Sequence, residues 1–389
     1  MAVTSNHEGQ TDRQMMERAL ELAARGQGKT SPNPMVGAVL VQGTNQIIGE
    51  GWHQKAGEPH AEILAMKDAR NRGHSLGGST LYVTLEPCST QGRTGPCVKA
   101  ILEAGIARVV CATTDPNPAH QGRGLELLRQ GGVEVQSGIL EETSRNLNRA
   151  FNYWIVNRTP LVTLKSAMSL DGKIATASGE SRWITGTEAR AHAMQFRSQV
   201  DAIITGVNTV IADNCSLTVR SLCGFNITHK DEDQSRLRRI VLDTEGRTPL
   251  NSNIVSDAWK HLTTVVVGSD APAERVEALS RQVQVWRIAS EGQGRLKLGE
   301  VLKKLGEESV THLLIEAGGT LSESFLHQKL VHRIHFYYAP KIIGGKSAPS
   351  GVGGEGVKHL AEAVKAVGPE WKRLGDDFLL EADICYPVR

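Results

Sequence analysis

The sequence feature that most restricts the fold is a set of three potential metal ligands that lie far apart in the chain. They are His60, Cys88 and Cys97. Each cysteine follows a proline, and His60 and Cys97 stand where helices are expected to begin. Free N–H groups and the positive end of the dipole at a helix start stabilise thiolates and so favour metal binding. One imidazole and two thiolates suit a tetrahedral zinc ion with a fourth position open to water, so the fold must bring the three side chains together.

Glu62, two positions after His60, adds a carboxylate that would lie beside the metal without binding it. A zinc ion can lower the pKa of its water to about 7. Glu62 could then take a proton from this water, pass one to a ring nitrogen and protonate a departing amine. Each residue alone would be assigned to packing. The combination predicts the site of a zinc-dependent nucleobase deaminase.

The spacing of the two cysteines departs from the common P-C-x-x-C pattern, because Cys97 lies nine positions after Cys88. The inserted residues 89–95 must form a loop over the site. Here the sequence resembles the bifunctional deaminase/reductase family of riboflavin biosynthesis, whose deaminase half carries E-P-C-S-x-x-G-[RK]-T-x-P-C. The resemblance continues through further stretches of both halves: Asn33 to Val39, Asp115 to Pro118, Gly122 to Gly124, Ser169 to Lys173, Ser178 to Ser181, Trp183 to Thr185 and Leu217 to Arg220.

The resemblance implies an α/β protein in two parts. Residues 1–150 would form a zinc-dependent deaminase domain, a cytidine-deaminase-like three-layer fold, and residues 160–389 an NADPH-dependent domain similar to dihydrofolate reductase. The length of 389 residues independently favours two domains, because it exceeds what one core usually serves. The turn-forming residues 157–160 predict the boundary.

The resemblance also implies two consecutive reactions on one small pyrimidine ribose phosphate. The first would be hydrolytic deamination of 2,5-diamino-6-ribosylamino-4(3H)-pyrimidinone 5′-phosphate. The second would be reduction of the ribosyl side chain by NADPH, which gives 5-amino-6-ribitylaminouracil 5′-phosphate. Because a nicotinamide cofactor carries the difficult chemistry itself, the reductase half would mainly orient it and hold the phosphate.

Hydrophobic periodicity predicts the coarse secondary structure. The first half reads as an α/β sandwich of about five strands, whose order in the sheet stays open. Strands are expected at 36–41 and 46–52, a first helix from a capping box at Thr11, and one connecting helix at 141–153. The second half begins with a strand-like run at 161–165.

A strand at 311–315 leads into Glu316, Gly318 and Gly319 at the start of a helix. Such a start is more often only a turn, but the family resemblance implies that it is the NADPH phosphate site. Glycines let a phosphate approach the backbone, and free N–H groups at a helix start favour its charge. The literal G-x-G-x-x-G of Gly351, Gly353 and Gly356 follows no clear strand. We therefore interpret it as a flexible loop and not as a dinucleotide fingerprint.

The family resemblance assigns roles to further positions, and arginines among them suit a ribose phosphate because their planar fork matches its oxygens. Independently of the resemblance, Glu62, Lys165 and Glu316 are expected to be catalytic. No acid–base pair marks the reductase half, and Lys165 and Glu316 are the candidates for polarising and anchoring the sugar. The expected cofactor-binding residues are Ala167, Trp183, Thr209, Asp213, Thr244, Gly318, Gly319 and Thr320. The expected substrate-binding residues are Asn33, Arg93, Ser181, Arg197, Leu217, Arg220 and Glu316.

Composition restricts the partners. A net charge of +2 and 4% aromatic residues provide neither a basic field nor stacking platforms for nucleic acid. No apolar run approaches the length of a membrane span, and the polar start lacks the apolar core of a signal peptide. Six cysteines without a dense framework suit a reducing compartment. We expect a cytoplasmic enzyme that forms a homo-oligomer.

Two other functions remain open at this point. One is a nucleoside or nucleic-acid deaminase with an accessory domain, which the balanced charge and the long loop between the cysteines disfavour. The other is a non-catalytic ligand sensor on the same scaffold, which the presence of Glu62 and all three metal ligands disfavours.

Overall fold

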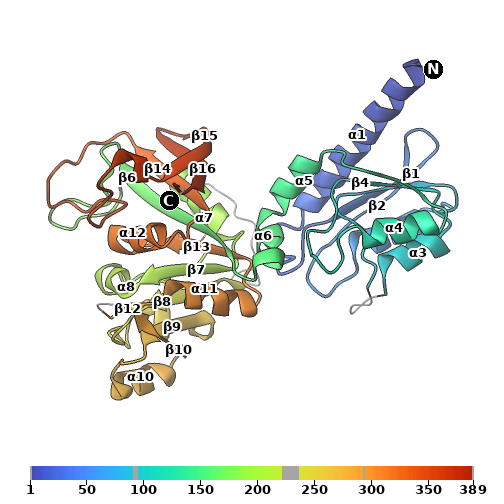
Figure 1. The fold of residues 1–389 in the computed structure, drawn as a ribbon. Coiled ribbons are helices and arrows are strands. Elements are labelled where there is room, and N and C mark those ends of the chain that lie inside the picture. Colours follow the sequence, from blue (N-terminus) through green and yellow to red (C-terminus); the bar gives the residue numbers. More distant parts are fainter. Residues whose placement is uncertain (1, 91–94, 221–235, 292–293, 388–389) are drawn as a thin grey trace. The chain divides into compact units, whose positions relative to one another are not determined.

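The computed structural model describes residues 2–90, 95–220, 236–291 and 294–387. The chain forms two compact units, Met1–Arg158 and Thr159–Arg389. Each unit has its own sheet and its own hydrophobic core (Figure 1), so we describe them one at a time.

The first unit contains a five-stranded sheet in the order β2-β1-β3-β4-β5. β1 runs antiparallel to β2 and β3, whereas β3, β4 and β5 are parallel. The strands are β1 (Gly37–Gln42), β2 (Gln46–Trp52), β3 (Thr80–Val83), β4 (Arg108–Cys111) and β5 (Glu134–Ser137). The helices are α1 (Ala2–Ala24), α2 (Ala61–Asn71), α3 (Cys97–Glu103), α4 (Arg123–Gln130), α5 (Glu141–Leu147) and α6 (Arg149–Asn157).

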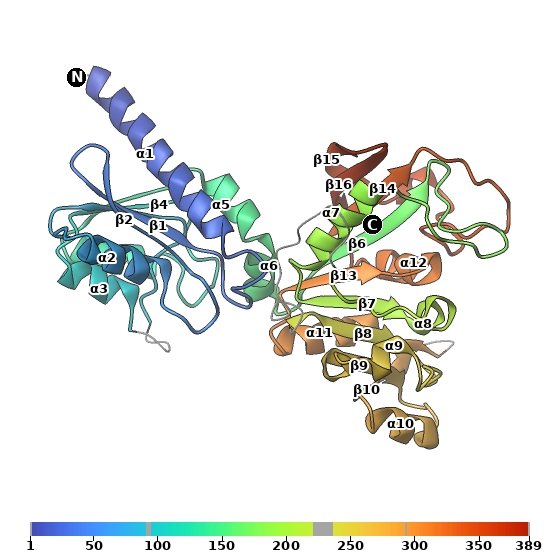
Figure 2. The ribbon, with the colours of Figure 1, turned by 180° about the vertical axis from the view of Figure 1, so that it is seen from behind.

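Helices cover both faces of this sheet, because successive residues of a strand point to opposite sides. Leu40 packs with α2, α3 and α4 on one face, and Val39 packs with α1 on the other (Figure 2). Glycines allow the layers to approach closely. A Cβ at Gly37 would lie 1.9 Å from the carbonyl oxygen of Ala19 in α1, and one at Gly51 would lie 2.4 Å from the backbone nitrogen of Ala65 in α2.

The predicted connecting helix at 141–153 is wrong, because the segment forms two helices, α5 and α6. The break falls at Asn148. Its side-chain oxygen accepts a hydrogen bond from the N–H of Met35 at 2.7 Å, and its amide donates to the Met35 carbonyl at 2.8 Å. The first helix also begins earlier than predicted, at Ala2 and not near Thr11.

The second unit contains a nine-stranded sheet in the order β10-β9-β8-β7-β13-β6-β14-β16-β15 and a two-stranded hairpin, β11-β12. The strands of the large sheet are β6 (Leu161–Ser169), β7 (Ala202–Gly206), β8 (Arg238–Leu242), β9 (Thr263–Gly268), β10 (Gln284–Ile288), β13 (His312–Glu316), β14 (Arg333–Ala339), β15 (Lys365–Leu374) and β16 (Asp377–Cys385). The hairpin consists of β11 (Ser290–Glu291) and β12 (Arg295–Leu296). From β10 to β14 all neighbours are parallel, and β16 is antiparallel to both β14 and β15.

Two hydrophobic clusters fill the two faces of the large sheet. One packs α11 and α12 against Leu164 and Ile204, and the other packs α8, α9 and α10 against Ile203 and Val241. The α-helices of this unit are α7 (Thr187–Arg197), α8 (Val207–Asp213), α9 (Asn253–Ser256), α10 (Ala273–Ser280), α11 (Leu298–Glu307) and α12 (Gly319–His327). Two short 3₁₀ helices are η2 (Lys260–Leu262) and η3 (Leu360–Glu362).

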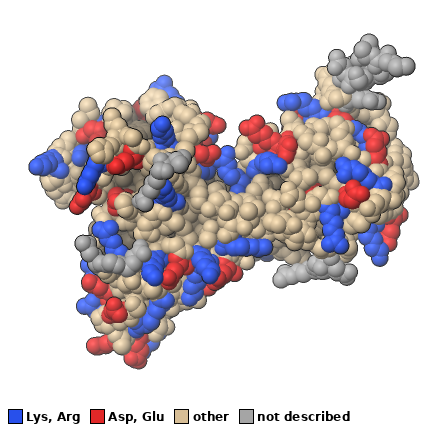
Figure 3. Space-filling model, in the orientation of Figure 1, with Lys and Arg blue, Asp and Glu red and all other residues tan. Residues whose placement is uncertain are grey.

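Surface charge is mixed on the face shown in Figure 3, where Lys and Arg alternate with Asp and Glu over both units. Among the described residues, no helix combines the length and the apolar character that a membrane crossing requires.

Three histidines of the second unit are buried or partly buried: His335 is buried, and His312 and His332 are partly buried. Desolvation lowers the pKa of His312 and His332 to about 4 and that of His335 to about 3. His335 also has Glu381 3.6 Å from its Nε2 atom, while its Nδ1 atom has no hydrogen-bond partner among the described residues. These side chains are therefore neutral in the folded protein at neutral pH.

Because the folded protein holds these histidines in the neutral form, we expect it to lose stability in mild acid. The folded pKa values lie below the unfolded value of about 6.5, so the unfolded state binds the protons first. The histidines contribute their full share to the free energy of unfolding above about pH 6.5. Below this pH, the free energy of unfolding falls by about 1 kcal/mol per pH unit for each histidine until the folded pKa is reached. Thermal unfolding between pH 7 and 5 should show a smaller pH slope in His335→Leu than in the wild type. The exposed His261→Leu is the control, and equal slopes in all three proteins would contradict the prediction.

Candidate functional site

The first unit brings the three predicted ligands together at one end of its sheet. His60 immediately precedes α2, Cys97 opens α3, and Cys88 lies in the loop after β3. The Nδ1 atom of His60 lies 3.5 Å from the sulfur of Cys88 and 3.3 Å from that of Cys97. All three ligand atoms lie within 4.8 Å of one another.

These distances fit a zinc ion. With Zn–N and Zn–S bonds of ordinary length and a tetrahedral angle, the nitrogen and each sulfur should be about 3.6 Å apart. The pKa values of the two thiols also favour a bound cation. The contact with Cys97 lowers the pKa of Cys88 to about 4, whereas the same contact and burial raise the pKa of Cys97. The two sulfurs can therefore both be thiolates only when a cation neutralises the second negative charge.

Glu62 lies on the first turn of α2 and is only 3% exposed. Desolvation raises the pKa of its carboxyl, although the charge of His60 acts in the opposite direction. A carboxyl with a raised pKa can both take up and release a proton near neutral pH. Glu62 thus has the environment of an acid–base group beside the metal ligands.

Asn33 is held beside the same cluster by His53. The Asn33 amide lies 3.1 Å from Nε2 of His53, whose Nδ1 lies 3.2 Å from the Pro59 carbonyl oxygen. In this arrangement Nδ1 carries the proton and Nε2 accepts from the amide. The His53 and His60 rings meet edge to face at 5.6 Å. Asn33 is therefore placed close to the ligands, as a substrate-binding residue requires, whereas Arg93 lies outside the described residues.

In the second unit the sheet register joins the two predicted catalytic residues. Glu316 at the end of β13 pairs with Lys165 on β6, and their charged groups are 3.6 Å apart. Arg197 from α7 binds the same carboxylate through two hydrogen bonds of 2.9 and 3.0 Å. Burial opposes the ionisation of Glu316, but the charges of Arg197 and Lys165 outweigh it and hold its pKa below the usual value.

The segment around Leu217 is fixed by two buried arginines. Arg239 donates to the Ser216 carbonyl at 2.8 Å, and Arg197 donates to the Thr218 carbonyl at 2.7 Å. Between them the buried Leu217 adopts φ 52°, a left-handed conformation that is rare for leucine. Such strain persists only where the surroundings enforce it. Arg239, which the sequence analysis missed, is itself paired with Asp257 at 2.6 Å.

A cavity of about 450 Å³ opens in the second unit and contains several expected cofactor-binding residues. Its lining includes Thr209, Thr244, Gly318, Gly319 and Thr320. Arg295 of the β11-β12 hairpin also lines it and was not predicted. The cavity therefore joins the ends of β7 and β8 to the start of α12.

The two glycines at the start of α12 have different roles. Gly318 has no atom within 4 Å of where a Cβ would stand, so it leaves open space at the cavity. At Gly319 a Cβ would lie 2.2 Å from the Ser350 carbonyl oxygen, and the N–H of Gly353 donates to the Gly319 carbonyl at 2.9 Å. The first part of the predicted loop at 351–356 therefore packs on α12.

The remaining predicted residues do not line this cavity. Trp183 is 65% exposed, with the guanidinium of Arg190 4.6 Å above its ring. Asp213 ends α8, and its carbonyl accepts from Arg182 at 3.1 Å. The others are Ala167, on β6 beside Tyr337, Ser181, which is partly exposed, and Arg220, which is exposed.

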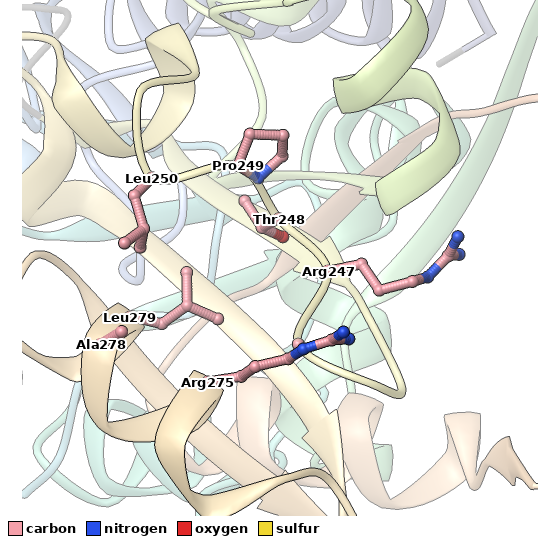
Figure 4. A pocket seen from close by; sticks show the side chains of 8 residues that line it. Arg247, Thr248, Pro249, Leu250, Arg275, Ala278 and Leu279 are labelled. Atoms are coloured by element: carbon pink, nitrogen blue, oxygen red, sulfur yellow. The ribbon is translucent and has the colours of Figure 1, made fainter.

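A second cavity, of about 370 Å³, lies beside the first and contains two arginines. Figure 4 shows Arg247, from the loop after β8, and Arg275, from α10, extending in the same direction. Arg247 donates to the side chain of Asn208, which lines the first cavity, at 3.1 Å. The sequence analysis missed both arginines. The only signal in the sequence was that Arg247 lies three positions after Thr244, a predicted cofactor-binding residue.

The fold and the two sites define a zinc-binding deaminase domain joined to a reductase domain. Residues 9–113 match the family described as cytidine and deoxycytidylate deaminase zinc-binding region, and residues 160–380 match the RibD C-terminal domain. The predicted fold class is confirmed: a cytidine-deaminase-like domain precedes one that resembles dihydrofolate reductase.

Relatives match across nearly the whole chain, so the chain belongs to the RibD family of riboflavin biosynthesis proteins. Riboflavin biosynthesis protein RibD of Actinobacillus pleuropneumoniae is 41% identical over 97% of this chain and 96% of its own length. That of Escherichia coli is 39% identical over 95% and 98%. The solved structure of Acinetobacter baumannii RibD has a TM-score of 0.84 with 37% identity, covering 97% of this chain and 100% of that one.

A Thermotoga maritima structure gives a TM-score of 0.80 at 33% identity, covering 97% of this chain and 99% of that one. It is described as a diaminohydroxyphosphoribosylaminopyrimidine deaminase/5-amino-6-(5-phosphoribosylamino)uracil reductase.

The ligand cluster predicts how zinc content should respond to substitution. Cys88→Ser should weaken zinc binding by about 100-fold or more, because a neutral hydroxyl replaces a thiolate. Glu62→Gln should retain zinc, since Glu62 is not among the ligands. Zinc can be counted by atomic absorption after dialysis, with the exposed Cys385→Ser as a control. Undiminished zinc in Cys88→Ser would contradict the assignment.

Proposed function

We propose that the two units catalyse consecutive steps of riboflavin biosynthesis. The first unit removes the 2-amino group of 2,5-diamino-6-ribosylamino-4(3H)-pyrimidinone 5′-phosphate by hydrolysis. The second reduces the ribosyl side chain of the product with NADPH and gives 5-amino-6-ribitylaminouracil 5′-phosphate. Residues 1–150 and 160–389 are the proposed domains, in agreement with the two compact units and the two family matches.

In the deaminase domain His60, Cys88 and Cys97 would hold zinc, and the geometry of their three ligand atoms is the observation that carries the proposal. Bound zinc supplies an acidified water at neutral pH. Glu62 would take one proton from this water and deliver it to the pyrimidine ring nitrogen, because its burial favours uptake. It would then take the second proton from the added hydroxyl and deliver it to the amine, which leaves as ammonia while the carbonyl forms. Asn33 and Arg93 would hold the substrate.

In the reductase domain the 450 Å³ cavity would hold NADPH against Thr209, Thr244, Gly318 and Thr320. The nicotinamide supplies the hydride. Lys165 would donate a hydrogen bond to the oxygen of the opened sugar, and Glu316 holds Lys165 and Arg197 in place. Ala167, Trp183, Asp213 and Gly319 complete the proposed cofactor set, and Ser181, Arg197, Leu217, Arg220 and Glu316 the proposed substrate set.

The two rival functions are not favoured. Relatives match through both units, so the second unit is not a separate accessory to a nucleoside or nucleic-acid deaminase. A non-catalytic sensor would not need an acid–base carboxyl, yet Glu62 is buried beside intact ligands.

Product analysis tests the proposed function. The full chain with zinc should convert the diaminopyrimidinone phosphate to the deaminated product without NADPH, and to the reduced product with it. Glu62→Gln should lose deamination by at least about 100-fold, because an amide cannot carry the proton, and still reduce substrate that is already deaminated. Mass spectrometry identifies the products. No deaminated product from the zinc-loaded wild type would refute the function.

The two arginines of the second cavity indicate why the protein would use NADPH and not NADH. We propose that Arg247 and Arg275 hold the 2′-phosphate that distinguishes NADPH from NADH, since an arginine near the ribose commonly does so. Arg247→Ala should then raise the KM for NADPH by roughly 10- to 100-fold, the value of a charged hydrogen bond, and leave that for NADH almost unchanged. The exposed Arg281→Ala is the control. Equal increases for both cofactors would contradict this role.

We also propose that the protein forms a homo-oligomer in the cytoplasm. The edge strand β15 and its neighbour β16 expose Val367, Trp371 and Phe378, which a second copy could cover. All five cysteines in the described part of the chain are free, in agreement with a reducing compartment. Sedimentation should give a multiple of the 42.1 kDa chain mass, and cell fractionation should locate the protein.

A further inference from the structure

A buried glutamate beside the metal ligands has no part in the chemistry described so far. Glu86 lies two residues before Cys88 and is 6% exposed. Its carboxylate accepts three backbone hydrogen bonds. One oxygen accepts from Asp115 at 3.0 Å and from Gly122 at 2.9 Å, and the other accepts from Gly124 at 2.7 Å. All three donors belong to residues 115–124, which we name the 115–124 segment.

The 115–124 segment packs closely against the turn formed by residues 86–88. A Cβ at Gly124 would lie 2.2 Å from the Pro87 carbonyl oxygen and 3.1 Å from the Glu86 carboxylate. Only glycine fits there. The segment therefore rests directly on the turn that carries Cys88, and any side chain at position 124 would push it away.

The charge of the metal ligand Cys88 also acts on Asp115, at the start of the segment. Burial raises the pKa of Asp115, and the charge of Cys88 contributes in the same direction. One oxygen of Asp115 accepts from the N–H of Asn117 at 2.9 Å, which shapes the turn at the start of the segment. The hydrogen bonds to Glu86 and the close approach of Gly124 to Pro87 thus place the segment against the turn that carries Cys88.

A carboxylate suits this position better than any neutral side chain. Three N–H donors converge on two oxygens, and a charged acceptor forms stronger hydrogen bonds than a neutral one. Glutamine of the same shape would turn an NH₂ group toward at least one N–H donor and leave that buried donor unpaired.

We infer that Glu86 is a positioning residue of the deaminase site, which fixes the 115–124 segment as a wall of the pyrimidine-binding space. This inference rests on the proposed deaminase function. Glu86 acts through the segment and not on the metal, since its carboxylate bonds to the segment and not to the ligands. Loss of the carboxylate should therefore weaken substrate binding and leave the zinc in place.

Two variants test the inference from opposite sides of the contact. Glu86→Gln removes the charged acceptor, and Gly124→Ala displaces the segment while Glu86 stays intact. Both should raise the KM for deamination by about tenfold, the value of one unpaired buried donor, with a smaller change in kcat. Zinc content and NADPH-dependent reduction should stay at wild-type values. The controls are Glu103→Gln, an exposed glutamate of the same unit, and Gly77→Ala, where a Cβ meets nothing closer than 3.9 Å.

Amide hydrogen exchange gives a readout that is independent of activity. The N–H groups of Asp115, Gly122 and Gly124 should exchange faster in Glu86→Gln than in the wild type. An unchanged KM in both variants, or a loss of zinc and thermal stability with unchanged KM, would overturn the inference. If the wild type exchanges slowly at these amides but does not deaminate the substrate, the proposed function fails, whereas protection that does not depend on Glu86 refutes the anchoring itself.

Discussion

Carboxylates that are removed from water set the chemistry of both sites, because a buried charge must be stabilised by its neighbours or be neutralised by a proton. At Glu62 desolvation outweighs the charge of His60 and the hydrogen bonds that oppose it, and the pKa rises. Glu316 has Arg197 and Lys165, and its pKa falls. The same residue type is therefore suited to carry a proton in one unit and stays an anion in the other, because the neighbouring charges and hydrogen bonds differ.

The fixed anions also hold the irregular segments that border the sites. The carboxylate of Glu316 accepts hydrogen bonds from Arg197. Arg197 also donates to the Thr218 carbonyl and so helps to keep Leu217 in its left-handed conformation. Glu86 receives three backbone N–H groups of the 115–124 segment. In each case the segment carries polar backbone groups that a hydrophobic core could not satisfy. Buried charged side chains therefore help to determine where these segments lie, beside the apolar packing of Leu217.

Glycine allows the close approaches on which this arrangement depends. Gly124 lets the segment rest on Pro87, and Gly319 lets the loop at Ser350 rest on α12. Gly319 belongs to the helix start that was expected to bind a phosphate. For Gly319, however, the structure shows that the missing side chain makes room for protein backbone, whereas Gly318 leaves room for a ligand.

The sequence alone determined the parts that depend on residue type and local pattern. His60, Cys88, Cys97 and Glu62 predict a zinc site because so few side chains can supply its chemistry, and the strand before Glu316 predicts the start of a helix. Tertiary structure decided the rest. The pairing of Lys165 with Glu316 follows from the β13-β6 register, and the break at Asn148 follows from its bonds to Met35. Arg247, Arg239 and Glu86 escaped sequence reasoning because an isolated charged residue gives no periodic signal. Their partners lie many positions away in the chain, and only the folded backbone brings those partners within hydrogen-bonding distance.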